Sequence, residues 1–166
     1  HSSFLFFQIL VQKYIIFSIP FDVFITFVLN FNFPIMIKQD YLIRMILEII
    51  TLIANALLNK QKIRKQNWIE YDCLTRQILG VPTENLKDMT PDEIREKYQG
   101  DPNEMGKVEL SAMTMLKMAE DIGNENLLLK SKLRQNGLHL LKQVQEDSNT
   151  YSIQRITLIQ AIENNL

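Results

Sequence analysis

Residues 36–59 read MIKQDYLIRMILEIITLIANALLN and decide the fold of this chain. Their polar side chains recur every three or four positions, close to the helical period, at Asp40, Arg44, Glu48, Thr51, Asn55 and Asn59. Nearly all other side chains are apolar, so the pattern predicts a helix over 37–59 with one narrow polar stripe. Because a surface helix ordinarily buries a narrower face, this helix needs cover on more than one side. Sister helices, a second copy of the protein or a membrane surface would each provide it.

Start and stop signals predict five further helices downstream. Gly80, followed by Pro82, ends the first of them, as is usual at helix exits. Thr90, Pro91 and Glu93 form a capping signature at the start of the next. The expected ranges are 67–79, 91–98, 102–121, 124–146 and 152–163.

The last three expected helices form a helical hairpin and a closing helix. Asp101 and Glu104 repeat the start signal before 102–121, and a short turn at Gly123 makes the next helix antiparallel. Gly137 would let a neighbouring helix approach closely. The closing helix is expected to bury isoleucines spaced by three, at Ile153, Ile156, Ile159 and Ile162. With no strand pair predicted, the fold class is all-α, with about six helices and the long apolar helix packed on the hairpin.

Residues 1–35 differ from the rest of the chain. They hold all nine phenylalanines and only two charged side chains, Lys13 and Asp22. We interpret this stretch as translation of sequence upstream of a start codon, with Met36 as the true start. A membrane segment, which Lys13, Pro20 and Asp22 would interrupt, and a β-rich extension are the alternatives. The expected organisation is therefore a hydrophobic extension over 1–35 and one helical domain over 36–166.

Composition excludes several classes of site. The single cysteine, Cys73, leaves no disulfide framework, and two histidines give little material for zinc. The net charge of −1 gives no global reason to expect nucleic acid. The charges are nevertheless unevenly placed, since residues 36–79 carry +3, residues 80–129 carry −6 and residues 130–166 carry +2.

Two groups of residues are candidates for contact with a partner. The first is a basic connector, here defined as Lys60, Lys62, Arg64 and Lys65, with Trp68 nearby. It would contact phosphates or lipid headgroups, or pair with the acidic middle of the chain or a second subunit. The second is a set of methionines suited to an adaptable binding groove, although core filling is the default for Met105, Met113, Met115 and Met118.

Catalytic and metal-binding patterns are weak in this sequence. Cys73 has no nearby base and is expected to be a small buried apolar residue. His139 is expected to be partly exposed or at the edge of the core, and not a metal ligand. The acids between 88 and 104 lack the spacing of a calcium loop and suit helix capping instead. No phosphate loop, nucleophile elbow or zinc motif is present, so we expect no enzyme, no metal and no cofactor.

Three motifs stand together in the chain: QDYLIRMI at Gln39–Ile46, then Leu86, Met89, Thr90, Pro91, Asp92 and Glu93, and finally Ser152, Arg155 and Ile159. Together they resemble a bacterial family named domain of unknown function 6483, over residues 36–166. The resemblance implies a hairpin over Lys107–Leu141 similar to a tetratricopeptide repeat. That hairpin departs from the repeat because it lacks the aromatic pair of the first helix. It also has Leu133 and Gly137 where an aromatic residue and an alanine would stand. The family has no assigned activity, so the resemblance implies no catalytic residues.

These observations favour a cytoplasmic bacterial module that binds a protein partner or self-associates, without catalysis. The alternative is a peripheral membrane protein held by helix 37–59, with or without 1–35, and by the basic connector at anionic headgroups. Nucleic-acid binding through Lys60–Arg76 is a weaker third hypothesis.

Overall fold

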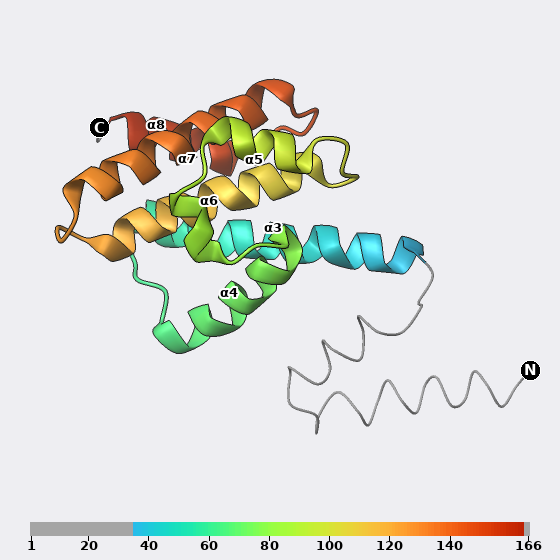
Figure 1. The fold of residues 1–166 in the computed structure, drawn as a ribbon, viewed down its shortest axis with the longest axis horizontal. Helices are drawn as coiled ribbons and strands as arrows, with labels where there is room; N and C mark the ends of the chain where they lie inside the picture. The colour runs from blue at the N-terminus through green and yellow to red at the C-terminus, as the bar shows by residue number, and fades with distance from the viewer. Residues whose placement is uncertain (1–34, 165–166) are drawn as a thin grey trace, which may run out of the picture. The chain divides into compact units, whose positions relative to one another are not determined.

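The computed structural model describes residues 35–164, and within that range it has six α-helices, one 3₁₀ helix and no strand (Figure 1). The predicted all-α class with six helices is confirmed. The elements are α3 (Ile35–Leu58), α4 (Lys65–Leu79), η1 (Thr83–Lys87), α5 (Pro91–Tyr98), α6 (Glu104–Ile122), α7 (Leu127–Asp147) and α8 (Ile153–Glu163). From Tyr41 onward these elements belong to one compact unit. The interpretations of 1–35 lie outside the described residues, apart from Ile35.

Local signals explain most helix ends. Thr90 forms the predicted capping box with Glu93, because its hydroxyl accepts from the Glu93 N–H and its own N–H donates to Glu93 Oε2 at 2.7 Å. This backbone hydrogen bond lowers the pKa of Glu93. Gly80 ends α4 in the left-handed conformation, at φ 69°, as predicted.

The start of α6 differs from the prediction. The helix begins at Glu104, two residues later than expected, and Asp101 does not cap it. Asp101 Oδ1 instead accepts from the Asn103 N–H at 2.7 Å, and Oδ2 forms an ion pair with Lys107 Nζ at 2.5 Å. Because the carboxylate closes a turn ahead of the helix, the chain enters α6 later than the pattern indicates.

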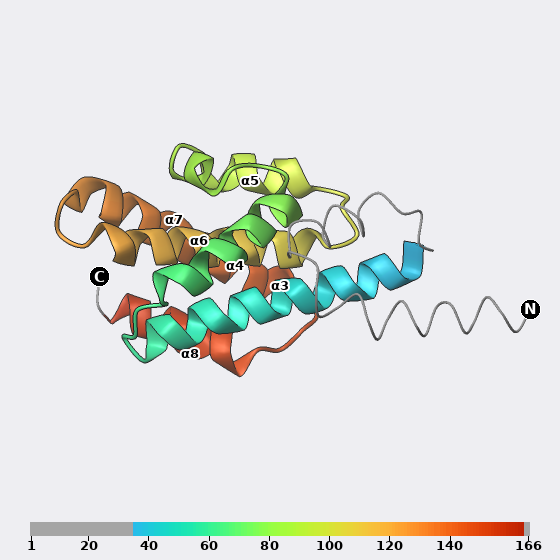
Figure 2. The same cartoon turned by 90° about the horizontal axis from the view of Figure 1, so that it is seen from below.

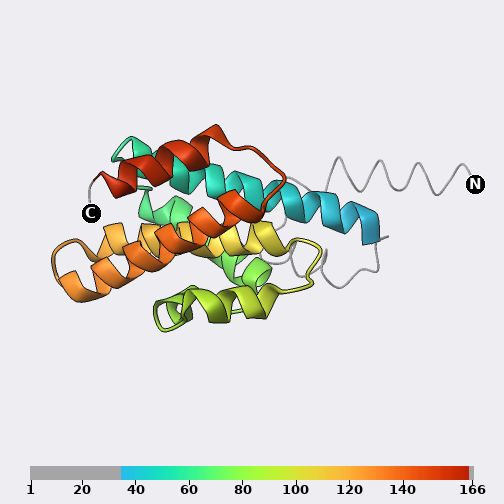
Figure 3. The same ribbon diagram turned by 90° about the horizontal axis from the view of Figure 1, so that it is seen from above.

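The antiparallel pair α6 and α7 is the centre of the fold. In Figures 2 and 3 these helices form a middle layer, with α5 on one side and α3 and α8 on the other. Gly137 allows the close approach predicted for it, since a Cβ there would lie 2.8 Å from Leu116 Cγ and 3.1 Å from the Ala112 carbonyl oxygen. Leu110, Leu133, Leu140 and Leu141 are among the fully buried side chains of this layer.

The long apolar helix packs onto the other helices, as predicted. Its buried side chains are Ile46, Ile49, Ile50, Ile53 and Ala54. Gly106 of α6 allows the Ile46 side chain to approach closely, because a Cβ at this position would lie 3.3 Å from Ile46 Cγ2. The start of α8 is tied to α3 by Gln154, whose Nε2 donates to Asn55 Oδ1 at 2.8 Å.

The buried face of α8 is not the predicted isoleucine stripe. Arg155 and Leu158 are its buried residues, whereas Ile153 is 70% exposed and Ile156 and Ile162 are half-buried. Steps of three fall short of the 3.6-residue helical turn by about 60° each. Over three such steps, four isoleucines therefore spread around half of the helix and cannot share one face.

A buried ion pair fastens α8 to the central layer. Arg155 Nη1 lies 2.9 Å from Glu109 Oε2 of α6, and its Nε donates to Gln145 Oε1 of α7 at 2.8 Å. Its Nη2 donates to the Thr150 carbonyl at 2.6 Å, while Ser152 caps α8 by accepting from the Arg155 N–H. Ser152 and Arg155 of the closing motif thus have structural roles, as a helix cap and as the link between α8 and the central layer.

Candidate functional site

The connector between α3 and α4 has a fixed and unusual backbone. The Gln61 N–H donates to the Ala56 carbonyl at 2.9 Å and the Lys60 N–H to the Leu57 carbonyl at 3.3 Å. This pair of bonds is the Schellman pattern of a helix end, in which glycine usually occupies the left-handed position. Here Lys60 occupies it, with φ 52°, and is the only described non-glycine residue with positive φ. The turn places the first lysine of the basic connector at a defined point.

A pocket of about 510 Å³ opens beside this connector. It lies among α3, the connector, α6, α8 and one residue of α7. Its apolar lining is Ile53, Ala56, Leu57, Leu58, Ile63, Leu116, Leu158, Ala161 and Ile162, and its polar lining is Lys60, Gln61, Lys62, Lys117, Glu120, Asp121 and Arg134. A concave apolar surface with a few convergent polar groups is the usual form of a small-molecule site.

Some of the charged groups that line the pocket form ion pairs, and others do not. Lys117 Nζ pairs with Asp121, one helical turn along α6. Arg134 Nη2 of α7 pairs with Glu120 at 2.6 Å. Lys60 and Lys62 are exposed and form no ion pair with any residue that the structure describes. The proposed pairing of the basic connector with the acidic middle of the chain is therefore not observed within 35–164.

Trp68 is engaged inside the protein. The Lys117 ammonium lies 4.0 Å from the centre of its ring, close enough for a cation–π interaction. Lys117 itself is buried and Trp68 is half-buried. The tryptophan predicted as a partner contact thus connects α4 to α6 at the edge of the pocket.

The candidate methionines separate into two pairs. Met113 and Met115 are buried in the core on α6, so their side chains are not available to a partner. Met105 and Met118 are half-buried on the same helix. Four methionines within 14 positions of one helix cannot share one face, because neighbouring positions differ by 100° in direction.

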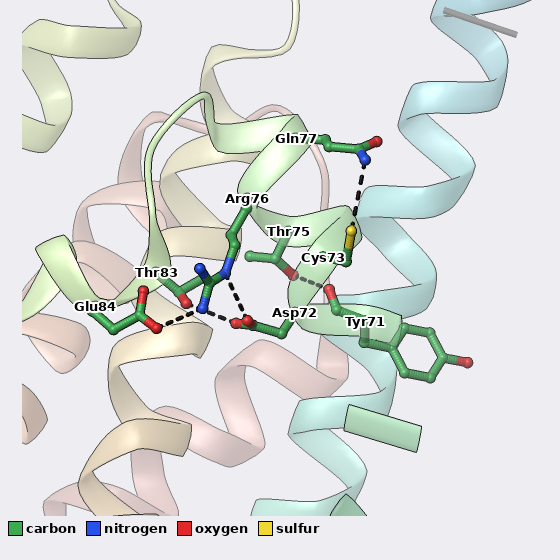
Figure 4. A network of polar contacts seen from close by, with 8 residues as sticks. All are labelled: Tyr71, Asp72, Cys73, Thr75, Arg76, Gln77, Thr83 and Glu84. Atoms are coloured by element: carbon green, nitrogen blue, oxygen red, sulfur yellow. Dashed lines mark hydrogen bonds and ion pairs between the residues drawn. The ribbon is translucent and has the colours of Figure 1, made fainter. Parts of the chain in front are cut away.

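Cys73 is exposed on α4, which corrects the prediction that it is buried. Its Sγ accepts from Gln77 Nε2 at 3.7 Å, and Figure 4 shows it beside a polar network on the same helix. In that network Arg76 joins Asp72 at 2.7 Å and Glu84 at 2.5 Å, tying α4 to η1. His139 is exposed on α7.

The charged residues of the polar stripe on α3 do not pair with one another. Arg44 lies four residues from both Asp40 and Glu48, but among the described residues the structure has no ion pair between Arg44 and either of them. Glu48 Oε1 instead accepts from the Tyr71 hydroxyl of α4 at 3.1 Å. Burial, followed by the hydrogen bond with Glu48, raises the pKa of Tyr71.

Within the described residues, no group of three His, Cys, Asp or Glu side chains is placed to hold a metal ion. One described helix segment, Gln39–Leu58, is long and apolar enough to cross a membrane by length and composition alone. Its side chains Ile49 and Ile53 are fully buried. Its first turns differ, since Tyr41, Ile43 and Leu47 are 49%, 40% and 55% exposed.

Comparison with protein-family models, with curated proteins and with solved structures gave no match to this chain.

Proposed function

We propose that the protein is a non-catalytic helical module of the bacterial cytoplasm that assembles with a second copy through α3. The observation that carries the proposal is the exposed apolar surface of this helix at Ile43 and Leu47. Tyr41 is exposed as well, but it lies about 160° around the helix from Ile43. Ile43 and Leu47 are one helical turn apart and so lie on the same side of the helix. Contiguous exposed apolar surface typically marks an interaction site, and a symmetric dimer would cover it on both copies.

The experiment is sedimentation equilibrium of the full chain and of a double variant, Ile43→Glu with Leu47→Glu. The wild-type chain is expected to be dimeric at about 10 μM, the range of a micromolar interface. Two carboxylates brought face to face with their copies would be desolvated and repel each other, so the double variant is expected to be monomeric.

The matched control is Thr51→Glu, an exposed polar-stripe position on the same helix. It adds one carboxylate, where the double variant adds two, and it removes no apolar surface, so we expect it to remain dimeric. A wild-type chain that is monomeric at about 100 μM would contradict the proposal. So would a double variant that dimerises as strongly as the Thr51→Glu protein.

A second candidate function is peripheral membrane association. It is favoured by the succession of a long apolar helix and the basic connector, in which Lys60 and Lys62 are exposed and unpaired within 35–164. Apolar insertion together with anionic headgroups would hold such a protein reversibly. In flotation with phosphatidylglycerol vesicles at low salt, this function requires binding that Ile43→Glu with Leu47→Glu abolishes. Recovery of the chain in the unbound fraction would contradict it.

A further inference from the structure

The pocket beside the connector has an apolar and charged lining that the proposed assembly through α3 does not involve. Its floor is apolar and comes from three helices, with Ile53 and Leu57 on α3, Leu116 on α6, and Leu158 and Ile162 on α8. Its volume of about 510 Å³ lies within the range of pockets that enclose small organic ligands. An apolar chain is the group that such a floor would take out of water.

The polar side of the pocket carries excess positive charge. Four cations and two carboxylates line it, and both carboxylates are already paired, Asp121 with Lys117 and Glu120 with Arg134. The charges of Lys60 and Lys62 are therefore left over at the pocket. An anionic group on a ligand would neutralise these two charges.

The position of Lys60 is set by the backbone. A left-handed conformation is sparsely populated for a lysine, and such backbone positions are common where a side chain serves a binding site. Two hydrogen bonds to the end of α3 hold this conformation, so the lysine side chain leaves the turn from a fixed place at the pocket.

The kind of anion follows from the groups that are free. The only guanidinium of the lining, on Arg134, is engaged with Glu120. What remains are two ammonium groups on separate flexible side chains, which bind an anion as point charges, and a carboxylate is the smallest anionic head group that an apolar chain carries. We infer that the pocket binds an unbranched amphipathic carboxylate, with its chain on the apolar floor and its carboxylate at Lys60 and Lys62.

The test is calorimetric titration of the full chain with sodium decanoate, below the concentration at which decanoate forms micelles. The matched probe is decyltrimethylammonium, which has the same chain and the opposite charge. Decanoate is expected to bind with one-to-one stoichiometry and at least about tenfold more tightly than the cation. Because the single tryptophan, Trp68, lies against Lys117 of the lining, its fluorescence is expected to change along the same binding curve.

A double variant, Lys60→Asn with Lys62→Gln, removes the unpaired charges from exposed positions. Asparagine tolerates the left-handed conformation at position 60, so the turn is retained. Decanoate binding is expected to weaken about tenfold, which corresponds to about 1.4 kcal/mol. The control, Lys65→Gln, removes one positive charge, where the double variant removes two, from the start of α4 outside the lining. It is expected to bind decanoate as the wild type does.

Three results would overturn the inference. The first is decanoate binding of equal strength in the wild type and the double variant. The second is binding of the decyl cation as tight as that of decanoate. The third is absence of decanoate binding while phosphatidylglycerol vesicles bind the wild type and not the double variant, which would assign Lys60 and Lys62 to a membrane surface.

Discussion

Replacing Arg155 by methionine keeps an unbranched apolar stem, shorter than the arginine side chain, and removes the charge. The side chain is only 2% exposed and makes an ion pair with Glu109 and hydrogen bonds to Gln145 and the Thr150 carbonyl. Removing one partner of such a buried pair costs about 3–5 kcal/mol, because the other charge is left without compensation. At pH 7.5 we therefore expect a loss of about 3–5 kcal/mol in the free energy of unfolding, a large part of the total for a domain of this size.

This loss should depend on pH. Burial raises the pKa of Glu109 above its usual value of 4.5, although Arg155 opposes the shift, and without Arg155 the pKa would rise further. A carboxyl whose pKa is higher in the folded state binds its proton more tightly there. Its contribution to stability is therefore fully present below pH 4.5 and declines as pH rises through the folded pKa. The Arg155→Met variant should lose less stability at pH 5 than at pH 7.5.

The assay is urea unfolding followed by circular dichroism at both pH values. A double-mutant cycle with Glu109→Gln isolates the pair, because glutamine retains an acceptor without the charge. The variant with both substitutions should show little of the pH dependence of Arg155→Met. A loss below about 1 kcal/mol at pH 7.5, or the same loss at both pH values, would refute this reasoning.

Four further substitutions test other features of the fold. Gly137→Ala should destabilise by about 1 kcal/mol net, because its Cβ would lie 2.8 Å from Leu116 Cγ and the clash exceeds the gain in helix propensity. Gly106→Ala should leave the free energy of unfolding nearly unchanged, because its Cβ would lie 3.3 Å from Ile46 Cγ2. Calorimetry that shows the same shift in Tm for Gly137→Ala and Gly106→Ala would contradict both expectations. Lys60→Gly should raise stability by about 1 kcal/mol in urea unfolding, since glycine adopts the left-handed turn without strain; an unchanged midpoint would exclude strain there. Burial raises the pKa of Tyr98 to about 12, so stability should fall as pH rises from 10 toward 12. Tyr98→Phe should remove this decline in alkaline unfolding curves, and its persistence would assign it to other groups.

The helices could be predicted from the sequence because their signals are local. The polar stripe from Asp40 to Asn55 follows the helical period, and its members are exposed in the structure. The Thr90 capping box and Gly80 exit depend only on neighbours within a turn. Asp101 shows the limit of such signals, because the same side chain can cap a helix or close a turn. In the structure it closes a turn and also forms an ion pair with Lys107.

The candidate site was only partly visible in the sequence. Lys60 and Lys62 were recognisable as a basic run, but their placement beside Leu158 and Arg134 was not. The role of Arg155 had a signal, since it is the only cation between Ile153 and Glu163, but nothing in the sequence indicated its partner. These contacts join residues tens of positions apart, and a periodic pattern contains no information on which distant face will meet it.

The sequence by itself determined where the helices lie and that the long apolar helix needs cover, because hydrogen bonding and amphipathic spacing act within a few residues. The tertiary structure decided which faces are covered. Met113 and Met115 are buried, whereas Leu47 is exposed. On α8 the buried residues are Arg155 and Leu158, not the predicted isoleucines. Lys60 and Lys62 both line the pocket. The physical reason is that burial is a property of the packed whole, settled by close packing and by the pairing of each buried charge.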